Sequence, residues 1–134
     1  MRKINNIILH CSATREGQNT TVADIERWHK ERGFRTIGYH YVIYLDGSVH
    51  KGRDVSEVGA HVTGQNADSI GICYIGGLNS EGKEKDTRTD AQKESLRKLV
   101  TELKGQFPDA TVHGHNEFAK KACPCFDVKK EFES

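Results

Sequence analysis

The 134-residue sequence lacks a long hydrophobic run and lacks an excess of charge of one sign. Its apolar stretches fall well short of the roughly 20 residues that a membrane-spanning helix needs, so the sequence predicts no membrane span. The Lys and Arg residues number 20 and the Asp and Glu residues 19, which gives a formal net charge of +1. That balance argues against a polybasic protein that binds nucleic acid and against an acidic tail.

The amino terminus is basic but has little apolar sequence. Its stretch Ile7-Ile8-Leu9 is shorter than the hydrophobic region of a secretory signal peptide, which has roughly 7–15 residues. We therefore expect a protein that is cytoplasmic as synthesised. Proline is also scarce, and no Pro-rich linker, repeat or low-complexity tract divides the chain. We expect one domain over residues 1–134, because this length is typical of a single domain.

Cysteine is less dense than in small disulfide-stabilised proteins, with four residues in the chain. Two disulfides are still one interpretation of that count. Seven histidines accompany the cysteines, and imidazole and thiolate are ligands that zinc prefers. The composition is therefore compatible with a compact enzyme or with a binding module, and a metal site is a second interpretation of the cysteines.

Strand and helix signals alternate along the chain. Strands are predicted at residues 4–9, 39–45, 48–51, 70–75 and 110–113, and the second and third form a hairpin around Asp46-Gly47. Capping-box patterns at Thr21 and Thr89 predict helices that end at Gly33 and by Gly105, and residues 127–132 predict a last helical turn or two. The second helix has an apolar stripe that consists of Ala91, Leu96, Leu99, Val100 and Leu103. This alternation is typical of an α/β domain.

Histidines and cysteines follow the first and last predicted strands. His10 ends the first strand, while His113 and His115 precede Cys123 and Cys125. A hydrolytic zinc site needs three protein ligands and one open position, so a site of two histidines and one cysteine is one interpretation. The sequence lacks a His-Glu-x-x-His motif, and a single residue separates the last two cysteines, whereas zinc ribbons have two or more.

Ordinary structural roles are the alternative for each of these residue types. His113 fits a packed or solvated histidine, and the Lys120-Lys121 pair fits a solvated basic surface. We expect His29, on the polar face of its helix, and His50, in the hairpin, to be exposed to solvent. Cys73 lies within an apolar strand, and we expect it to be a small buried hydrophobic residue.

Motifs from residue 9 to residue 124 occur in the order of a known family. They are Leu9-His10-Cys11-Ser12-Ala13-Thr14, Gly38-Tyr39-His40-Tyr41-Val42-Ile43, Asp46-Gly47, Gly52-Arg53, Gly59-Ala60-His61, Asn66, Ser69-Ile70-Gly71-Ile72, Gly114-His115 and Lys121-Ala122-Cys123-Pro124. In these motifs the sequence resembles the zinc-dependent type 2 N-acetylmuramoyl-L-alanine amidases. That family shares its fold with the animal peptidoglycan recognition proteins and includes small phage lysozymes that are amidases.

The resemblance implies a fold and a set of site residues. The fold is a single α/β domain in which helices flank a central mixed β-sheet. The residues that match the family's pattern are the zinc ligands His10, His115 and Cys123, the catalytic Tyr39 and Lys121, and the substrate-groove His61. In the family, the tyrosine lies close to the metal-bound water and the lysine stabilises charge on the substrate carbonyl. Cys125 has no counterpart in that pattern, and a ligand swap or an oxidative pairing is open for it.

The activity implied is hydrolysis of the amide bond between N-acetylmuramic acid and L-alanine in peptidoglycan, with one catalytic Zn²⁺. We expect a monomer whose partner is peptidoglycan, with no nucleic acid and no membrane span. A phage or prophage endolysin, an enzyme injected into rival cells and a recycling enzyme all fit such a chain. The alternative is a non-catalytic peptidoglycan-binding module of the same fold, because some relatives have lost the cysteine ligand.

Overall fold

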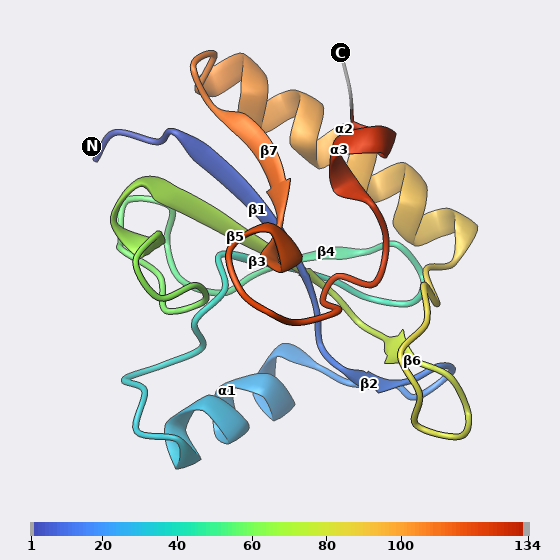
Figure 1. Ribbon diagram of the computed structural model, residues 1–134. Coiled ribbons are helices and arrows are strands. Elements are labelled where there is room, and N and C mark those ends of the chain that lie inside the picture. The colour runs from blue at the N-terminus through green and yellow to red at the C-terminus, as the bar shows by residue number, and fades with distance from the viewer. Residues whose placement is uncertain (1, 133–134) are drawn as a thin grey trace.

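A five-stranded sheet organises the computed structural model, which describes residues 2–132 (Figure 1). The strands lie in the order β4 (Val49–Lys51), β3 (Tyr41–Ile43), β5 (Ser69–Tyr74), β1 (Asn6–Cys11) and β7 (Thr111–Gly114). Strand β1 pairs in parallel with β5 and β7, β5 pairs in parallel with β3, and β3 pairs antiparallel with β4. The predicted α/β class and mixed sheet are confirmed. The expected domain limits, residues 1 and 134, lie outside the described residues.

Strand β1 is buried on both of its faces. Successive side chains of a strand point to opposite sides, so Ile7, Leu9 and Cys11 share one face while Ile8 and His10 share the other. The first set belongs to the larger hydrophobic core, on the side of the sheet that α2 (Asp90–Gln106) covers. The His10 side chain, 1% exposed, therefore lies on the side of the sheet opposite α2.

Helix α2 begins at the predicted capping box, in which Thr89 and Gln92 bond each other's backbone N–H groups. The predicted apolar stripe of this helix is wrong at one position, because Ala91 is exposed and Gln92 is buried instead. The Gln92 amide donates hydrogen bonds to the carbonyl oxygens of Ile43 and Ile75, at 3.3 and 3.0 Å. A buried polar side chain is stable where it satisfies such backbone groups. The helix also continues one residue beyond Gly105.

Helix α1 (Val22–Glu31) belongs to the opposite side of the sheet, where Ile25 joins a smaller core with Ile37, Val42 and Ile75. Its capping box at Thr21 is confirmed. The expectation that His29 is exposed is wrong, because its side chain is buried and accepts a hydrogen bond from the backbone N–H of Gly38, with Nδ1 2.8 Å from the nitrogen. The chain after the helix folds back over it, which helix periodicity alone does not reveal.

The short elements complete the fold. The hairpin turn is confirmed by a φ of +86° at Gly47, and His50 is partly packed rather than exposed, since its ring stacks on Tyr44 with centroids 3.7 Å apart. The predicted last helix is α3 (Val128–Glu131), capped by Asp127. Four elements were not predicted: strands β2 (Thr14–Arg15) and β6 (Gly77–Leu78), which pair with each other, and the 3₁₀ turns η1 (Asn66–Asp68) and η2 (His115–Glu117).

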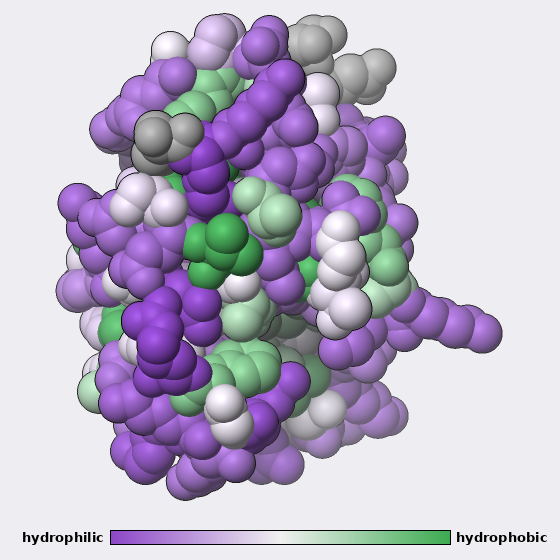
Figure 2. Space-filling view, turned by 90° about the vertical axis from the view of Figure 1, so that its left-hand side faces the viewer, coloured by the Kyte–Doolittle hydropathy of each residue, from purple (hydrophilic) through white to green (hydrophobic). Residues whose placement is uncertain are grey.

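The surface is mostly polar on the face that Figure 2 shows, where hydrophobic residues form small separate groups. Three large hydrophobic residues are exposed among the described residues, namely Val49, Val58 and Phe118. No helix within residues 2–132 is both long and apolar enough to cross a bilayer.

Because His29 is buried, the free energy of unfolding should depend on pH. Burial lowers its pKa from 6.5 to about 4, so between these values the unfolded chain binds a proton that the folded chain does not. The free energy of unfolding should therefore fall as the pH drops from 6.5 to 4, by up to about 1.4 kcal/mol per pH unit for this one proton. His29→Asn keeps a hydrogen-bond acceptor and does not titrate, so its urea-unfolding curves should show a smaller slope. Equal slopes for the two proteins would contradict this assignment.

Candidate metal centre

Two histidines and one cysteine meet at the carboxyl end of β1. In the parallel pairing of β1 with β7, Leu9 lies opposite Gly114, so the next residues, His10 and His115, are neighbours, with ring centroids 4.7 Å apart. Cys123 comes from the loop that precedes α3. One ligand atom from each of the three lies within 4.8 Å of the other two. The structure thus brings together the three residues that the sequence predicts as metal ligands.

The loop that carries Cys123 is held against the sheet by two hydrogen bonds. The backbone N–H of Cys11 donates to Cys123 Sγ at 3.2 Å. The Tyr74 hydroxyl donates to the carbonyl oxygen of Pro124 at 2.6 Å. Sequence reasoning missed the role of Tyr74, although a tyrosine in a buried strand usually signals a hydroxyl with a partner. Strands β1 and β5 therefore fix the position of the sulfur.

The donor set fits zinc. Zinc takes imidazole nitrogen and thiolate sulfur in tetrahedral sites, and catalytic sites use three protein ligands and leave the fourth position open. With Zn–N near 2.0 Å and Zn–S near 2.3 Å, the nitrogen and sulfur of such a site lie about 3.6 Å apart. His10 Nδ1 lies 3.9 Å from Cys123 Sγ, which is close to that separation.

Both histidines of this group are poor bases in the folded chain. Burial lowers the pKa of His10 well below its usual value, and burial followed by the positive charge of Lys121 lowers the pKa of His115. Both rings are therefore neutral near pH 7. A neutral imidazole keeps a lone pair for a metal, so the site favours metal binding over protonation.

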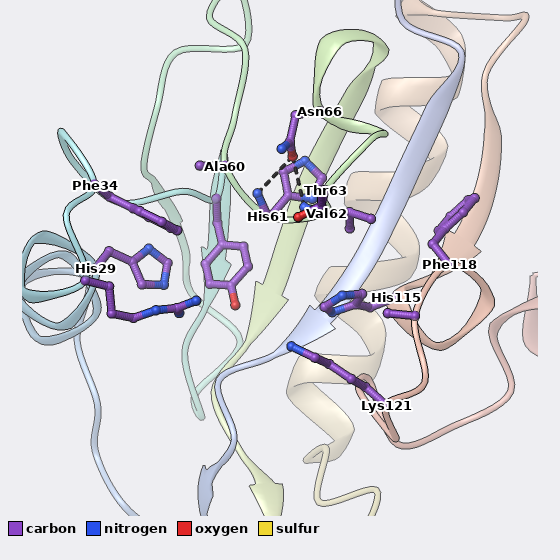
Figure 3. Close-up of a pocket in the computed structure, with 13 residues that line it drawn as sticks. His29, Phe34, Ala60, His61, Val62, Thr63, Asn66, His115, Phe118 and Lys121 are labelled. Atoms are coloured by element: carbon purple, nitrogen blue, oxygen red, sulfur yellow. Dashed lines mark hydrogen bonds between the residues drawn. The ribbon is translucent and has the colours of Figure 1, made fainter.

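Tyr39 and Lys121 lie beside these three residues. The Tyr39 ring centroid is 5.0 Å from that of His10. Burial raises the pKa of the Tyr39 hydroxyl well above its usual value, so the hydroxyl is protonated at neutral pH and able to donate a hydrogen bond. Lys121 is exposed, and its side chain points into the same cleft as His115 (Figure 3).

His61 contacts the centre from the other side. Its Nδ1 lies 2.8 Å from His10 Nε2, and its Nε2 lies 3.1 Å from Ser69 Oγ. Burial lowers its pKa to about 3. The Asn66 side chain accepts hydrogen bonds from the backbone N–H groups of His61 and Val62, as the dashed lines in Figure 3 show. Asn66 therefore fixes the loop that carries His61. Sequence reasoning quoted Ser69 in a motif but missed its contact with His61.

A cleft of about 430 Å³ opens next to the group of three ligands. Its lining includes His29, Tyr39, His61, Asn66, His115 and Lys121. A second hollow of about 260 Å³ is lined in part by Cys11, Cys123 and the same Tyr39, His115 and Lys121. Of the three ligands, His115 lines both spaces and Cys123 lines the second, so the candidate metal centre is within reach of a bound molecule.

The remaining histidine and cysteine candidates lie outside this group. His113 points to Glu117, with Nδ1 2.8 Å from Oε1. Cys73 is fully buried, as predicted. All four cysteines are free thiols, so the two-disulfide interpretation is wrong for this structure. Cys125 Sγ lies 4.0 Å from Cys11 Sγ, and the metal group contains Cys123 rather than Cys125.

Comparisons with known proteins agree on one family. A family model described as N-acetylmuramoyl-L-alanine amidase matches residues 1–126. The endolysin of Escherichia phage T7 is 46% identical over 127 residues, which cover 95% of this chain and 84% of that protein. The N-acetylmuramoyl-L-alanine amidase LysC from Clostridium intestinale superimposes with a TM-score of 0.83 at 31% identity, covering 97% and 82% of the two chains. Drosophila PGRP-LB gives a TM-score of 0.78 at 25% identity, covering 92% and 76%.

Substitution of Cys123 and substitution of Cys125 should have different effects on metal binding. Cys123→Ser removes a thiolate of the candidate metal centre, so zinc affinity measured by competition with a chromophoric chelator should fall by at least tenfold. Cys125→Ser changes a thiol two residues away that lies outside the group, and its affinity should stay within about threefold of the original. The ligand assignment is wrong if the two variants bind zinc equally well.

Proposed function

The chain belongs to the N-acetylmuramoyl-L-alanine amidase family, and we propose that His10, His115 and Cys123 hold the zinc ion of its active site. As a member of that family, the protein hydrolyses the amide bond between N-acetylmuramic acid and L-alanine, and its place of action is the bacterial cell wall. The observation that carries the zinc proposal is the meeting of these three ligand atoms beside an open cleft.

An unactivated amide requires a strong nucleophile and stabilisation of the negative charge that develops on its carbonyl oxygen. When bound, zinc supplies Lewis acidity, which activates water near neutral pH and polarises a carbonyl group. Lys121 places its ammonium group in the same cleft as His115. We assign Lys121 to stabilising the carbonyl oxygen as the amide carbon becomes tetrahedral, since a positive charge is most effective where negative charge develops.

Tyr39 lies on the cleft side of His10. Its protonated hydroxyl is suited to orienting the attacking water and to donating a hydrogen bond to the leaving amine. A tyrosine is a weak base at neutral pH, with a reference pKa near 10, so orientation and donation are the roles assigned to it here. His61 lines the cleft from the opposite side and is assigned to contact the substrate.

Catalysis is favoured over simple peptidoglycan binding because the third ligand position is occupied by a thiol that is held in place. Cys123 Sγ accepts a hydrogen bond from β1, and Lys121 lies two residues before it in the same loop. A binding module has no need of these groups. All six proposed site residues come from one chain, so we propose that the monomer is the active unit.

The zinc assignment is tested on purified cell walls and on a defined muropeptide. The protein should release stem peptides with a free L-alanine amino group, lose this activity after chelation, and regain it when Zn²⁺ is added. Chemical identification of the new amino terminus by mass spectrometry establishes which bond is cut. Activity that survives complete removal of metal would overturn the zinc assignment.

Two adjacent lysines allow a matched test of the charge assigned to Lys121. Lys121→Met keeps the aliphatic chain and removes the ammonium group, and kcat/KM on the muropeptide should fall by about 10²–10³, the usual effect of losing one donor to a developing oxyanion. Lys120→Met makes the same chemical change one residue earlier, outside the lining of the cleft, and should change kcat/KM by less than about threefold. Similar losses in both variants would show that general surface charge, rather than Lys121, accounts for the effect.

A further inference from the structure

His61 lies on the face of the sheet that carries His10. In the parallel pairing of β1 with β5, Ile8 lies opposite Gly71 and His10 lies opposite Cys73. Ser69 and Gly71 share that face, because they are two residues apart in β5. His61 follows the hairpin in the chain and packs onto this face between Ser69 and His10.

Gly71 makes room for the His61 ring. A Cβ atom at position 71 would lie 2.7–2.8 Å from three atoms of that ring, closer than real Cβ atoms approach other atoms. Any side chain at position 71 would therefore displace the ring from the sheet. The close approach holds the ring against β5, where both of its nitrogens reach hydrogen-bonding partners.

The hydrogen bonds have one direction once His10 presents Nδ1 to a metal. His10 Nδ1 faces Cys123 Sγ at 3.9 Å, so a ligating lone pair on Nδ1 leaves the proton on Nε2. That N–H donates to His61 Nδ1 at 2.8 Å, which requires a lone pair there. The His61 proton is then on Nε2 and is donated to Ser69 Oγ at 3.1 Å. Ser69 has no exposed surface, so water does not compete for this end of the chain of hydrogen bonds.

We propose that His61 and Ser69 are positioning residues that hold His10 in the tautomer and orientation that bind zinc. The inference rests on the proposed metal centre and adds to it two residues that do not touch the metal. Partners behind a metal-bound histidine commonly fix its tautomer, and their loss lowers metal affinity by about 10- to 100-fold. The substrate contact assigned to His61 is then restricted, because both of its ring nitrogens already form hydrogen bonds.

The test measures zinc affinity in four variants by chelator competition. Ser69→Ala removes the last acceptor and His61→Leu removes the ring nitrogens, and each should weaken zinc binding by about 10- to 100-fold. His61→Asn keeps an acceptor near the position of Nδ1 and should recover most of the loss. Ser95→Ala removes a comparable serine hydrogen bond, from Ser95 Oγ to the Gly47 carbonyl oxygen, far from the centre, and should bind zinc like the original protein.

A second readout uses the unmodified protein and so does not depend on a variant that folds. Long-range ¹H–¹⁵N NMR spectra of the metal-free protein should show His10 with its proton on Nε2. A proton on Nδ1, or Ser69→Ala and His61→Leu variants that bind zinc as tightly as the original, would overturn the inference and leave the zinc assignment intact. An original protein that binds no zinc would overturn the assignment and the inference together.

A kinetic comparison separates positioning from substrate contact. If His61 acts only on the substrate, His61→Leu raises KM and leaves zinc affinity unchanged, which contradicts the proposal. If it positions His10, zinc affinity falls, and zinc in excess restores kcat. Ser69 has no surface toward the cleft, so the effect of Ser69→Ala should appear in zinc affinity rather than in KM.

Discussion

Strand β1 is constrained by two parallel partners, and this constraint sets the geometry of both the hydrophobic core and the candidate metal centre. Hydrogen bonds to β5 on one side and to β7 on the other fix the register of β1, and with it the face of the sheet to which each β1 side chain points. Because the period of a strand is two residues, a shift of one residue would move His10 into the core under α2 and place Leu9 at the cleft. The buried positions Ile7 and Leu9 prevent that shift, since both lie in the larger core.

The same constraint assembles a site from distant parts of the chain. Parallel strands have their carboxyl ends at one edge of the sheet, so the residues that follow β1 and β7 meet there. The hydrogen bond from Tyr74, in β5, to Pro124 holds the Cys123 loop at that edge. Three neighbouring strands thus control the two imidazoles and the thiol. A rigid sheet suits this task, because a catalytic metal requires ligands that are positioned before the metal binds.

Local signals in the sequence account for most of the fold. Thr21 and Thr89 begin helices through contacts within four residues, and Asp46-Gly47 forms a turn through its own backbone geometry, so these elements are predictable from short segments. His29 and Gln92 are different, because each is buried where a backbone group from outside its own helix forms a hydrogen bond with it. The two-residue strands β2 and β6 owe their existence to their mutual pairing, and no local pattern predicts them.

The candidate site was predictable to a different extent. Residue spacing did not choose between His113 and His115, and the family resemblance favoured His115, which is the one that reaches His10 in the structure. Ser69 belongs to one of the motifs that carry the resemblance, but no role was predicted for it, because a serine in an apolar strand has no special pattern of its own. Its connection to His61 depends on the fold of a loop that is eight residues away in sequence. The expectation that the newly synthesised protein is cytoplasmic stays a prediction.

The proposed centre binds one metal ion through two imidazoles and one thiolate. X-ray absorption at the zinc edge of the zinc-loaded protein identifies these ligands, because nitrogen and sulfur neighbours lie at different distances from the metal. The spectrum should contain one sulfur at about 2.3 Å together with nitrogen or oxygen neighbours at about 2.0 Å, at least two of them imidazole. A spectrum without sulfur, or with two sulfurs, would contradict a centre formed by His10, His115 and Cys123.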